Sequence, residues 1–543
     1  MKSGTIKNLF ITVAAAISLA SCAKKLDLYP VNDLTPATAY STPEGYKGVL
    51  AKIYGGLSST GNTGPAGSSD IQGLDEGSQS PFIRGFFNHQ ELPTDEAVVS
   101  WNDQTIHNFH NLRWTSSDPF ILGMYARPIY NITVINEYLR EATDEKLSER
   151  GITGTAANEI KTSVAEVRFL RAFNYWVMMD LFGKSTFITE ENLIGTDLPE
   201  QIERAELFNY IEQELKAIET DLAAPRSIEY GRVDQGSAWA LLARMYLNAG
   251  VYTGTPKYTE AITYAKKVID AGYTLSDNYE ELFMADNHKH ANEIIFPITN
   301  DGLNTSSFGN TTFFIHAASG DDHGEYGVVS GGGWSGYRAT SALGLKFEDR
   351  TGATDKRALF TTSKYSPSDQ QMQIPDVTVF DNGLHVRKYR NIRSDGGPVS
   401  DVKREFSDID FPVFRLPEMF LIYAEAVLRG GSGGDQTMAL EYLNRIRFRA
   451  YGNSYGPGNI GKLNAGDLDL QLIIDERARE LYWEGHRRTD LVRYDMLTTG
   501  TYLWPWKGGV SSGTSVESKY NLYPIPSANL SANPNLTQNP DYN

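Results

Sequence analysis

Acidic residues that occur in pairs are the first candidates for chemistry in this chain, because glycosidases place two carboxyl groups across a sugar bond. Asp95 and Glu96 are adjacent, Asp103 follows shortly after, and the pair Asp75 and Glu76 stands upstream. Adjacent side chains in an extended segment point to opposite faces, which is poor geometry for one shared substrate. These carboxylates therefore give little support for a hydrolase.

A second acidic set lies near the C-terminal end of the chain. Glu476, Glu480 and Glu484 are spaced by four residues, so a helix would place them on one face. Four arginines are interleaved with them: Arg477, Arg479, Arg487 and Arg488. This alternation of charges favours a salt-bridge network over a catalytic role.

Other enzyme signatures are absent or incomplete in the sequence. The string Gly183-Lys184-Ser185-Thr186 resembles the end of a phosphate-binding loop, but Met178 stands where the first glycine is needed, and a helical pattern precedes the string. We interpret it as the end of a helix. His288 and His290 flank Lys289 in a predicted loop and are not at helical metal-binding spacing. The strings therefore predict no catalytic residue and no metal site.

Aromatic residues in predicted loops carry a stronger functional signal. Trp334 lies in the string Gly331–Tyr337, among glycines and a serine, and Trp101 is followed by Asn102, Asp103 and Gln104. Flat rings match the apolar C–H face of a sugar, and amide and guanidinium groups match its hydroxyl fringe. This pattern is typical of sugar binding. The alternative is that both tryptophans pack inward as anchors of their loops.

The elements that must position these residues are mainly helical. Apolar residues recur at three- and four-residue spacing in several segments. The predicted helices cover residues 46–57, 162–182, 206–222, 237–249, 258–270, 417–428, 438–450 and 470–488. In 237–270, small residues such as Ala240 and Ala261 alternate with bulky ones such as Trp239 and Tyr264, which resembles the packing of tetratricopeptide (TPR) helix hairpins. A generic helical bundle is the alternative.

Two long regions between these helices lack a helical period. Residues 60–125 and 296–410 are rich in Gly, Ser, Asp and aromatic residues. Loops of this length inside a compact chain are usually functional. We therefore predict a mainly α fold, with TPR-like helices at about 46–57, 160–290 and 415–490. An irregular, loop-rich binding lobe is expected at about 60–125 and 296–410.

The N-terminus has the features of an exported lipoprotein. Lys2 and Lys7 precede an apolar stretch over residues 9–20, which is too short to span a bilayer, and Leu19-Ala20-Ser21-Cys22 follows. Cys22 is the single cysteine among 543 residues. We predict a signal peptide at residues 1–21, lipid attachment at Cys22, a polar tether at 22–45 and one domain at 46–543.

Composition limits the partners of the exported chain. A hydrophobic content of 41% suits a large core stabilised without disulfides. Removal of the signal peptide takes away Lys2 and Lys7 but no acidic residue, which changes the formal net charge from −17 to −19. An acidic surface argues against nucleic acid as a partner and suits a neutral ligand.

Several strings resemble the SusD/RagB family of outer-membrane lipoproteins of Bacteroidetes, and the resemblance covers essentially the whole mature chain. The family hallmarks are Ala165–Ala172, Leu181–Gly183, Tyr423–Ala426, Asp475–Leu481, Glu484–Arg488 and Tyr523–Pro526. Strings nearer to the starch-binding members are Glu91–Glu96, Gly250–Gly254, Glu281–Asn287, Arg393–Gly396 and Trp506–Gly509.

The resemblance implies a TPR-like scaffold and a cell-surface protein that is not an enzyme. It would capture starch or maltooligosaccharides by aromatic stacking and deliver them to a SusC-like TonB-dependent transporter. By position, the resemblance assigns glycan contacts to Trp334, Trp101, Phe308, Arg84 and Gln104. Another glycan, a peptide ligand or a glycoside hydrolase are the alternatives.

Three substitutions depart from the family pattern. Gln104 stands where the starch-binding member has a binding asparagine, which keeps the amide chemistry. Val99 stands where the starch-binding member has an aromatic residue of its binding arc, which would remove one stacking plane. His288 replaces an aspartate of a family calcium site, so calcium is left open as a cofactor.

Overall fold

The computed structural model describes residues 36–65, 67–103, 105–192, 195, 197–319, 323–329, 331–361, 372–455 and 458–542. The predicted signal peptide, Cys22, most of the tether and Gln104 lie outside the described residues.

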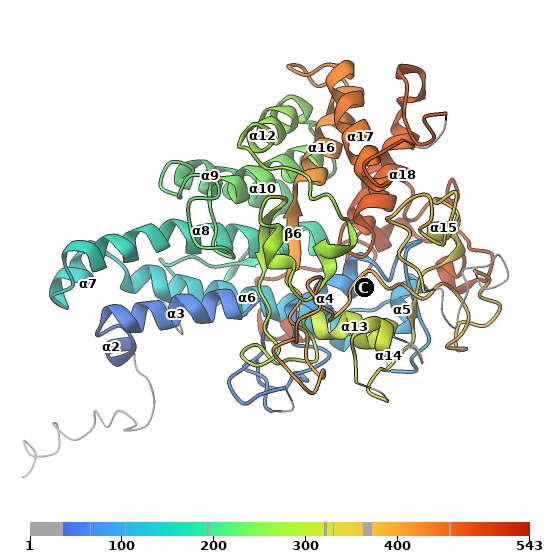
Figure 1. Ribbon diagram of the computed structural model, residues 1–543. Helices are drawn as coiled ribbons and strands as arrows, with labels where there is room; N and C mark the ends of the chain where they lie inside the picture. The colour runs from blue at the N-terminus through green and yellow to red at the C-terminus, as the bar shows by residue number, and fades with distance from the viewer. Residues whose placement is uncertain are drawn as a thin grey trace, which may run out of the picture.

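Helices dominate the described structure, as predicted, and the longest ones form the scaffold (Figure 1). These are α3 (Pro43–Gly55), α6 (Pro119–Glu141), α8 (Gly154–Phe182), α9 (Arg204–Ile218), α10 (Gln235–Leu247), α12 (Tyr258–Asp270), α16 (Leu416–Leu428), α17 (Gln436–Ala450) and α18 (Leu470–Leu481). Shorter helices join them: α2 (Pro36–Ala39), α7 (Asp144–Glu149), α11 (Ala249–Thr253), α19 (Arg487–Arg493) and α20 (Ser527–Ala532).

Successive scaffold helices pack side by side as hairpins. Helix α8 packs on α6 and α9, α10 packs on α12, and α16 packs on both α12 and α17. Ala240, Ala243, Ala261 and Ala265 are fully buried between helices, where small side chains let two backbones approach closely. Asp234 caps α10 by accepting a hydrogen bond of 3.0 Å from the backbone N–H of Ser237. The predicted TPR-like hairpin scaffold is confirmed.

Three short antiparallel strand pairs connect distant segments. They are β1 (Val98–Val99) with β5 (Tyr337–Arg338), β2 (Ser185–Phe187) with β3 (Glu200–Ile202), and β4 (Ile294–Ile298) with β6 (Phe411–Arg415). The pair β4–β6 is fully buried and joins the lobe to the helical scaffold. Pair β1–β5 brings the segment before Trp101 beside the segment after Trp334.

The predicted lobe consists mostly of loops with short helices, on the lower right of Figure 1. These helices are α4 (Phe82–Gln90), α5 (His107–His110), α13 (Thr311–Ala318), α14 (His323–Tyr326) and α15 (Ser341–Gly344). Every residue of α4 is buried, so this helix forms part of the core beneath the loops. The division of the chain into anchor, tether and one domain stays a prediction.

Several predicted boundaries were wrong. The tether was expected to reach residue 45, but α2 and the start of α3 occupy 36–45, and Tyr40 is buried. Helix α6 was missed because Pro128 interrupts its pattern. The helix expected over 470–488 is two helices, since Trp483 and Gly485 between them have φ angles of 62° and 81°.

The Gly183–Thr186 string ends a helix, as predicted. Helix α8 ends at Phe182, Gly183 has a φ of 75°, and Ser185 begins β2. Within the described ranges, no helix is both long enough and apolar enough to cross a membrane.

Candidate functional site

One groove contains four of the five predicted contact residues. Arg84, Trp101, Phe308 and Trp334 all line a groove of about 1020 Å³. They come from α4, the segment after β1, the loop before α13 and the loop before β5, so the fold alone brings them together. Their assignment to glycan binding stays a prediction.

The rings of Phe308, Trp334 and Trp101 lie in a row, with neighbouring ring planes inclined to each other. The ring centroids of Phe308 and Trp334 are 5.9 Å apart with planes at 57°, and those of Trp334 and Trp101 are 6.2 Å apart at 63°. All three side chains are partly exposed. Because neighbouring planes are tilted, the three rings do not form one flat platform.

Trp334 is neither an exposed ring nor a fully buried anchor. His316 stacks on the indole with centroids 4.7 Å apart and planes at 28°. The backbone N–H groups of Trp334 and Ser335 both donate to the carbonyl oxygen of His316, at 2.8 and 2.9 Å. His316 therefore supports one face of the indole, and the side chain stays partly exposed to the groove.

Two of the glycines beside Trp334, Gly333 and Gly336, allow close packing against other segments. A Cβ atom at Gly333 would lie 1.9 Å from Oγ of Ser319. At Gly336, where φ is 105°, a Cβ would lie 2.2 Å from Nε1 of Trp101. That nitrogen donates a 2.7 Å hydrogen bond to the carbonyl oxygen of Ser335, so the two tryptophan segments are joined directly.

Arg84 lies in the groove with donor groups to spare. Its Nη1 donates to the carbonyl oxygen of Gly77 at 2.9 Å, and its guanidinium lies 5.5 Å from the ring centroid of Trp101 and 4.9 Å from that of Phe313. Among the described residues, no carboxylate forms an ion pair with Arg84. Burial lowers the pKa of Arg84. A guanidinium held this way can donate to ligand hydroxyls.

Acidic side chains lie along the same groove. Asp75, Glu76 and Asp103 line it, and the hydroxyl of Thr60 donates to Glu76 at 2.8 Å. Burial raises the pKa of Glu76 to about 7. Asp95 lies elsewhere, fully buried, and accepts two 2.7 Å hydrogen bonds from Arg487.

The predicted network around Glu476, Glu480 and Glu484 exists, but it is buried and its partners mostly differ from those expected. Of the four arginines named from the sequence, only Arg479 pairs with one of these glutamates. The others pair with Asp490, Asp95 and Asp180. The main partners of the glutamates are Arg357, Arg415, Arg447, Arg449 and Lys388, which come from other segments.

Of the three positions that depart from the family pattern, Gln104 lies outside the described residues, and Val99 and His288 lie outside the groove lining. Val99 is fully buried in β1 opposite Tyr337, so its side chain does not reach the groove. His288 is exposed, and the ammonium of the next residue, Lys289, lies 2.9 Å from Asp286 and 2.7 Å from Asp395. In the described part of the chain, no group of three or more His, Cys, Asp or Glu side chains is placed to hold a metal ion.

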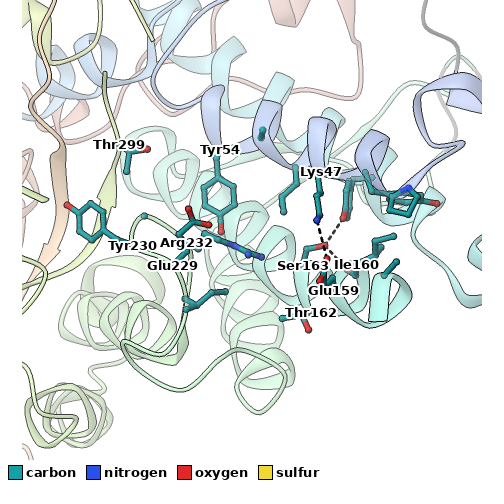
Figure 2. Close-up of a pocket in the computed structure, with 18 residues that line it drawn as sticks. Lys47, Tyr54, Glu159, Ile160, Thr162, Ser163, Glu229, Tyr230, Arg232 and Thr299 are labelled. Carbon is teal, nitrogen blue, oxygen red and sulfur yellow. Dashed lines mark hydrogen bonds and ion pairs between the residues drawn. The ribbon is translucent and has the colours of Figure 1, made fainter. Parts of the chain in front are cut away.

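A separate cavity of about 640 Å³ lies between α3, α8 and residues 228–232 (Figure 2). It shares no lining residue with the groove. Two of its polar lining groups are already held by a neighbouring carboxylate: the hydroxyl of Tyr54 donates to Glu166 at 2.6 Å, and Arg232 forms an ion pair with the same Glu166. The groove is therefore the better candidate site.

One aromatic residue of the groove has no counterpart among the sequence predictions. Phe380 lines the groove and is 40% exposed. The signal available in the sequence is an aromatic residue directly before the turn-forming string Asp381-Asn382-Gly383.

A helix-hairpin scaffold with an open aromatic groove defines a ligand-binding protein. Residues 356–542 match the sequence model of the SusD family. Over the full length of both chains, the protein is 38% identical to the starch-binding protein SusD of Bacteroides thetaiotaomicron. The chain belongs to the SusD family.

Solved structures share the fold. A SusD homolog of Bacteroides thetaiotaomicron is 19% identical with a TM-score of 0.70, covering 94% of this chain and 99% of its own. Surface glycan-binding protein A of the same species, solved in complex with laminarihexaose, is 19% identical with a TM-score of 0.66, covering 91% and 99%. The family consists of carbohydrate-binding proteins and not enzymes, which confirms the prediction that the chain is not an enzyme.

Proposed function

We propose that the chain binds the α-1,4-glucan of starch, and its maltooligosaccharide fragments, in the groove lined by Arg84, Trp101, Phe308 and Trp334. The observation that carries the proposal is the meeting of three tilted, partly exposed rings with a guanidinium that has donors to spare. The starch-binding relative, 38% identical over its full length, supports the choice of glucan.

The chemistry of the groove matches a neutral sugar chain. Each ring that covers about 100 Å² of a sugar contributes about 2.5 kcal/mol at 25 cal/mol per Å². Two or three rings contribute about 5–7 kcal/mol before the costs of association and ordering are subtracted. The smaller net free energy left after those costs corresponds to binding between millimolar and high micromolar. Weak binding of this kind suits a polymer with many equivalent sites.

The same proposal includes the cellular setting. The mature chain is held on the outer face of the outer membrane by acyl chains on Cys22, and it delivers captured oligosaccharides to a SusC-like TonB-dependent transporter. One acyl chain gives only marginal membrane binding, so stable anchoring needs several. The N-terminal signal and the family membership support this setting.

Affinity electrophoresis of the mature chain in gels containing amylopectin tests the function. Wild type should be retarded, and Trp334→Ala should run as in a gel without polysaccharide. Trp239→Ala is the matched control, because Trp239 is a partly buried tryptophan on α10 outside the groove. Equal retardation of the Trp334→Ala variant and wild type would reject the proposed site.

A parallel gel with laminarin separates the glucan proposal from its main alternative. The structural neighbour solved in complex with laminarihexaose makes laminarin the alternative ligand. Retardation in laminarin but not in amylopectin would keep glycan binding and replace the α-glucan. New reducing ends after incubation with amylopectin would contradict the assignment as a binding protein.

A further inference from the structure

Phe380 is an exposed aromatic residue in the groove, and its loop is built rigidly. The hydroxyl of Ser100 donates to the carbonyl oxygen of Val377 at 2.9 Å, and Nη2 of Arg338 donates to the same oxygen at 3.0 Å. Nη1 of Arg338 donates to the carbonyl oxygen of Val379. Arg338 is fully buried, so a desolvated guanidinium is used to hold the backbone on both sides of Thr378.

Two further contacts fix the base of this loop. Val98, Ile374 and Val377 form a small buried cluster against which Trp506 packs. The indole N–H of Trp506 donates to the carbonyl oxygen of Ile374 at 2.9 Å. The loop therefore has its own apolar anchor, yet Phe380 near its tip keeps 40% of its surface exposed. A rigid loop that leaves a phenylalanine in water loses hydrophobic stabilisation that inward packing would supply.

The position of the loop extends the row of rings. Trp334 contacts Phe308 on one side and Trp101 on the other. Ser100 directly precedes Trp101 and donates its hydroxyl hydrogen bond to the Phe380 loop. Phe380 thus follows on the Trp101 side of the groove. Within the described part of the chain, no ring contact joins Phe380 to any of the three rings of the row. A sugar unit on Phe380 is therefore a different unit from the one on Trp334.

We propose that Phe380 is a further stacking residue of the groove, which contacts a sugar unit beyond the three-ring row and makes the groove select longer glucans over short ones. This inference rests on the proposed function. Thr378 also lines the groove and is exposed beside Phe380. Its hydroxyl donates to Oδ1 of Asp376 at 2.7 Å, so its oxygen is left as an acceptor for the same unit.

Titration calorimetry of the mature chain with maltotriose and with maltoheptaose tests the inference. Phe380→Ala should weaken binding of maltoheptaose about tenfold, which corresponds to about 1.4 kcal/mol, and leave maltotriose within about twofold. Phe380→Tyr should restore most of the lost affinity, since it keeps the ring. Phe448→Ala is the matched control, because Phe448 is 41% exposed on α17 and outside the groove.

Three outcomes would overturn the role of Phe380. They are an unchanged affinity of Phe380→Ala for maltoheptaose, equal weakening for both ligands, and the same loss in Phe448→Ala. The proposed function is judged separately by Trp334→Ala, which should weaken both ligands. If wild type binds neither glucan, the proposed function fails and the role of Phe380 fails with it.

Discussion

Gly336→Ala tests the close packing that joins the two tryptophan segments. The added Cβ would lie 2.2 Å from Nε1 and 2.5 Å from Cδ1 of Trp101. These atoms belong to a ring that is held by its hydrogen bond to Ser335 and by a tilted contact with Tyr337. The methyl group must therefore displace the indole or the loop.

The expected loss in free energy of unfolding for Gly336→Ala is the sum of a backbone part and a packing part. A non-glycine residue in a left-handed or otherwise strained backbone region costs about 1–2 kcal/mol, and the φ of 105° at Gly336 lies there. Overpacking against Trp101 costs about 1–3 kcal/mol more. We expect Gly336→Ala to lower the free energy of unfolding by about 2–5 kcal/mol and to abolish retardation in amylopectin gels.

A double-mutant cycle isolates the contact with the indole. In a Trp101→Ala background the added methyl group no longer meets the indole. Gly336→Ala should then lower the free energy of unfolding only by the backbone part, which gives a coupling energy of about 1–3 kcal/mol between the two positions. Gly331→Ala is the matched control, because Gly331 lies in the same loop with a φ of 80°, and a Cβ atom added there would have no heavy atom within 4 Å. Urea unfolding monitored by circular dichroism gives each free energy. Additive effects within about 0.5 kcal/mol would refute the reasoning.

Three further predictions follow from the charged groups. Because burial raises the pKa of Glu76 from 4.5 to about 7, the stability that its protonated form contributes is present below about pH 4.5 and lost as the pH rises through 7. Glu76→Gln should thus have the same free energy of unfolding as wild type at pH 4.5 and a higher one, by up to about 3 kcal/mol, at pH 8. Equal free energies of unfolding at pH 8 would contradict the idea that burial penalises the ionised Glu76. Arg415→Met should lose about 3–5 kcal/mol in urea unfolding, since it leaves Glu480 and Glu484 without a main buried partner, and a loss below about 1 kcal/mol would contradict this. Arg84→Met should weaken glucan binding by about 1–3 kcal/mol with little change in unfolding, and unaltered gel mobility would argue against its role.

Much of the scaffold was readable from the sequence because local periodicity determines which faces are apolar. The helix expected over 258–270 has those bounds in the structure, and small residues such as Ala240 and Ala261 are buried between helices as expected. The break between α18 and α19 was not readable. A Cβ at Gly485 would lie 2.3 Å from Phe86, which is about 400 residues away in the chain, and Glu91 accepts the N–H of Gly485 at 2.6 Å. Only tertiary contacts select that turn.

The candidate site, like the scaffold, could be predicted from the sequence only in part. Residue type together with glycine-rich surroundings singled out Trp334, and the polar side chains after Trp101 singled out that residue; family resemblance added Phe308 and Arg84. Side-chain chemistry depends on the residue alone, so the groups that could stack on or bind a sugar can be identified from the amino-acid sequence. It did not determine how exposed they are, how their planes are tilted, or that Phe380 joins them. Those features depend on contacts such as that between Trp334 and His316, and the groove exists only because the fold brings distant segments of the chain together.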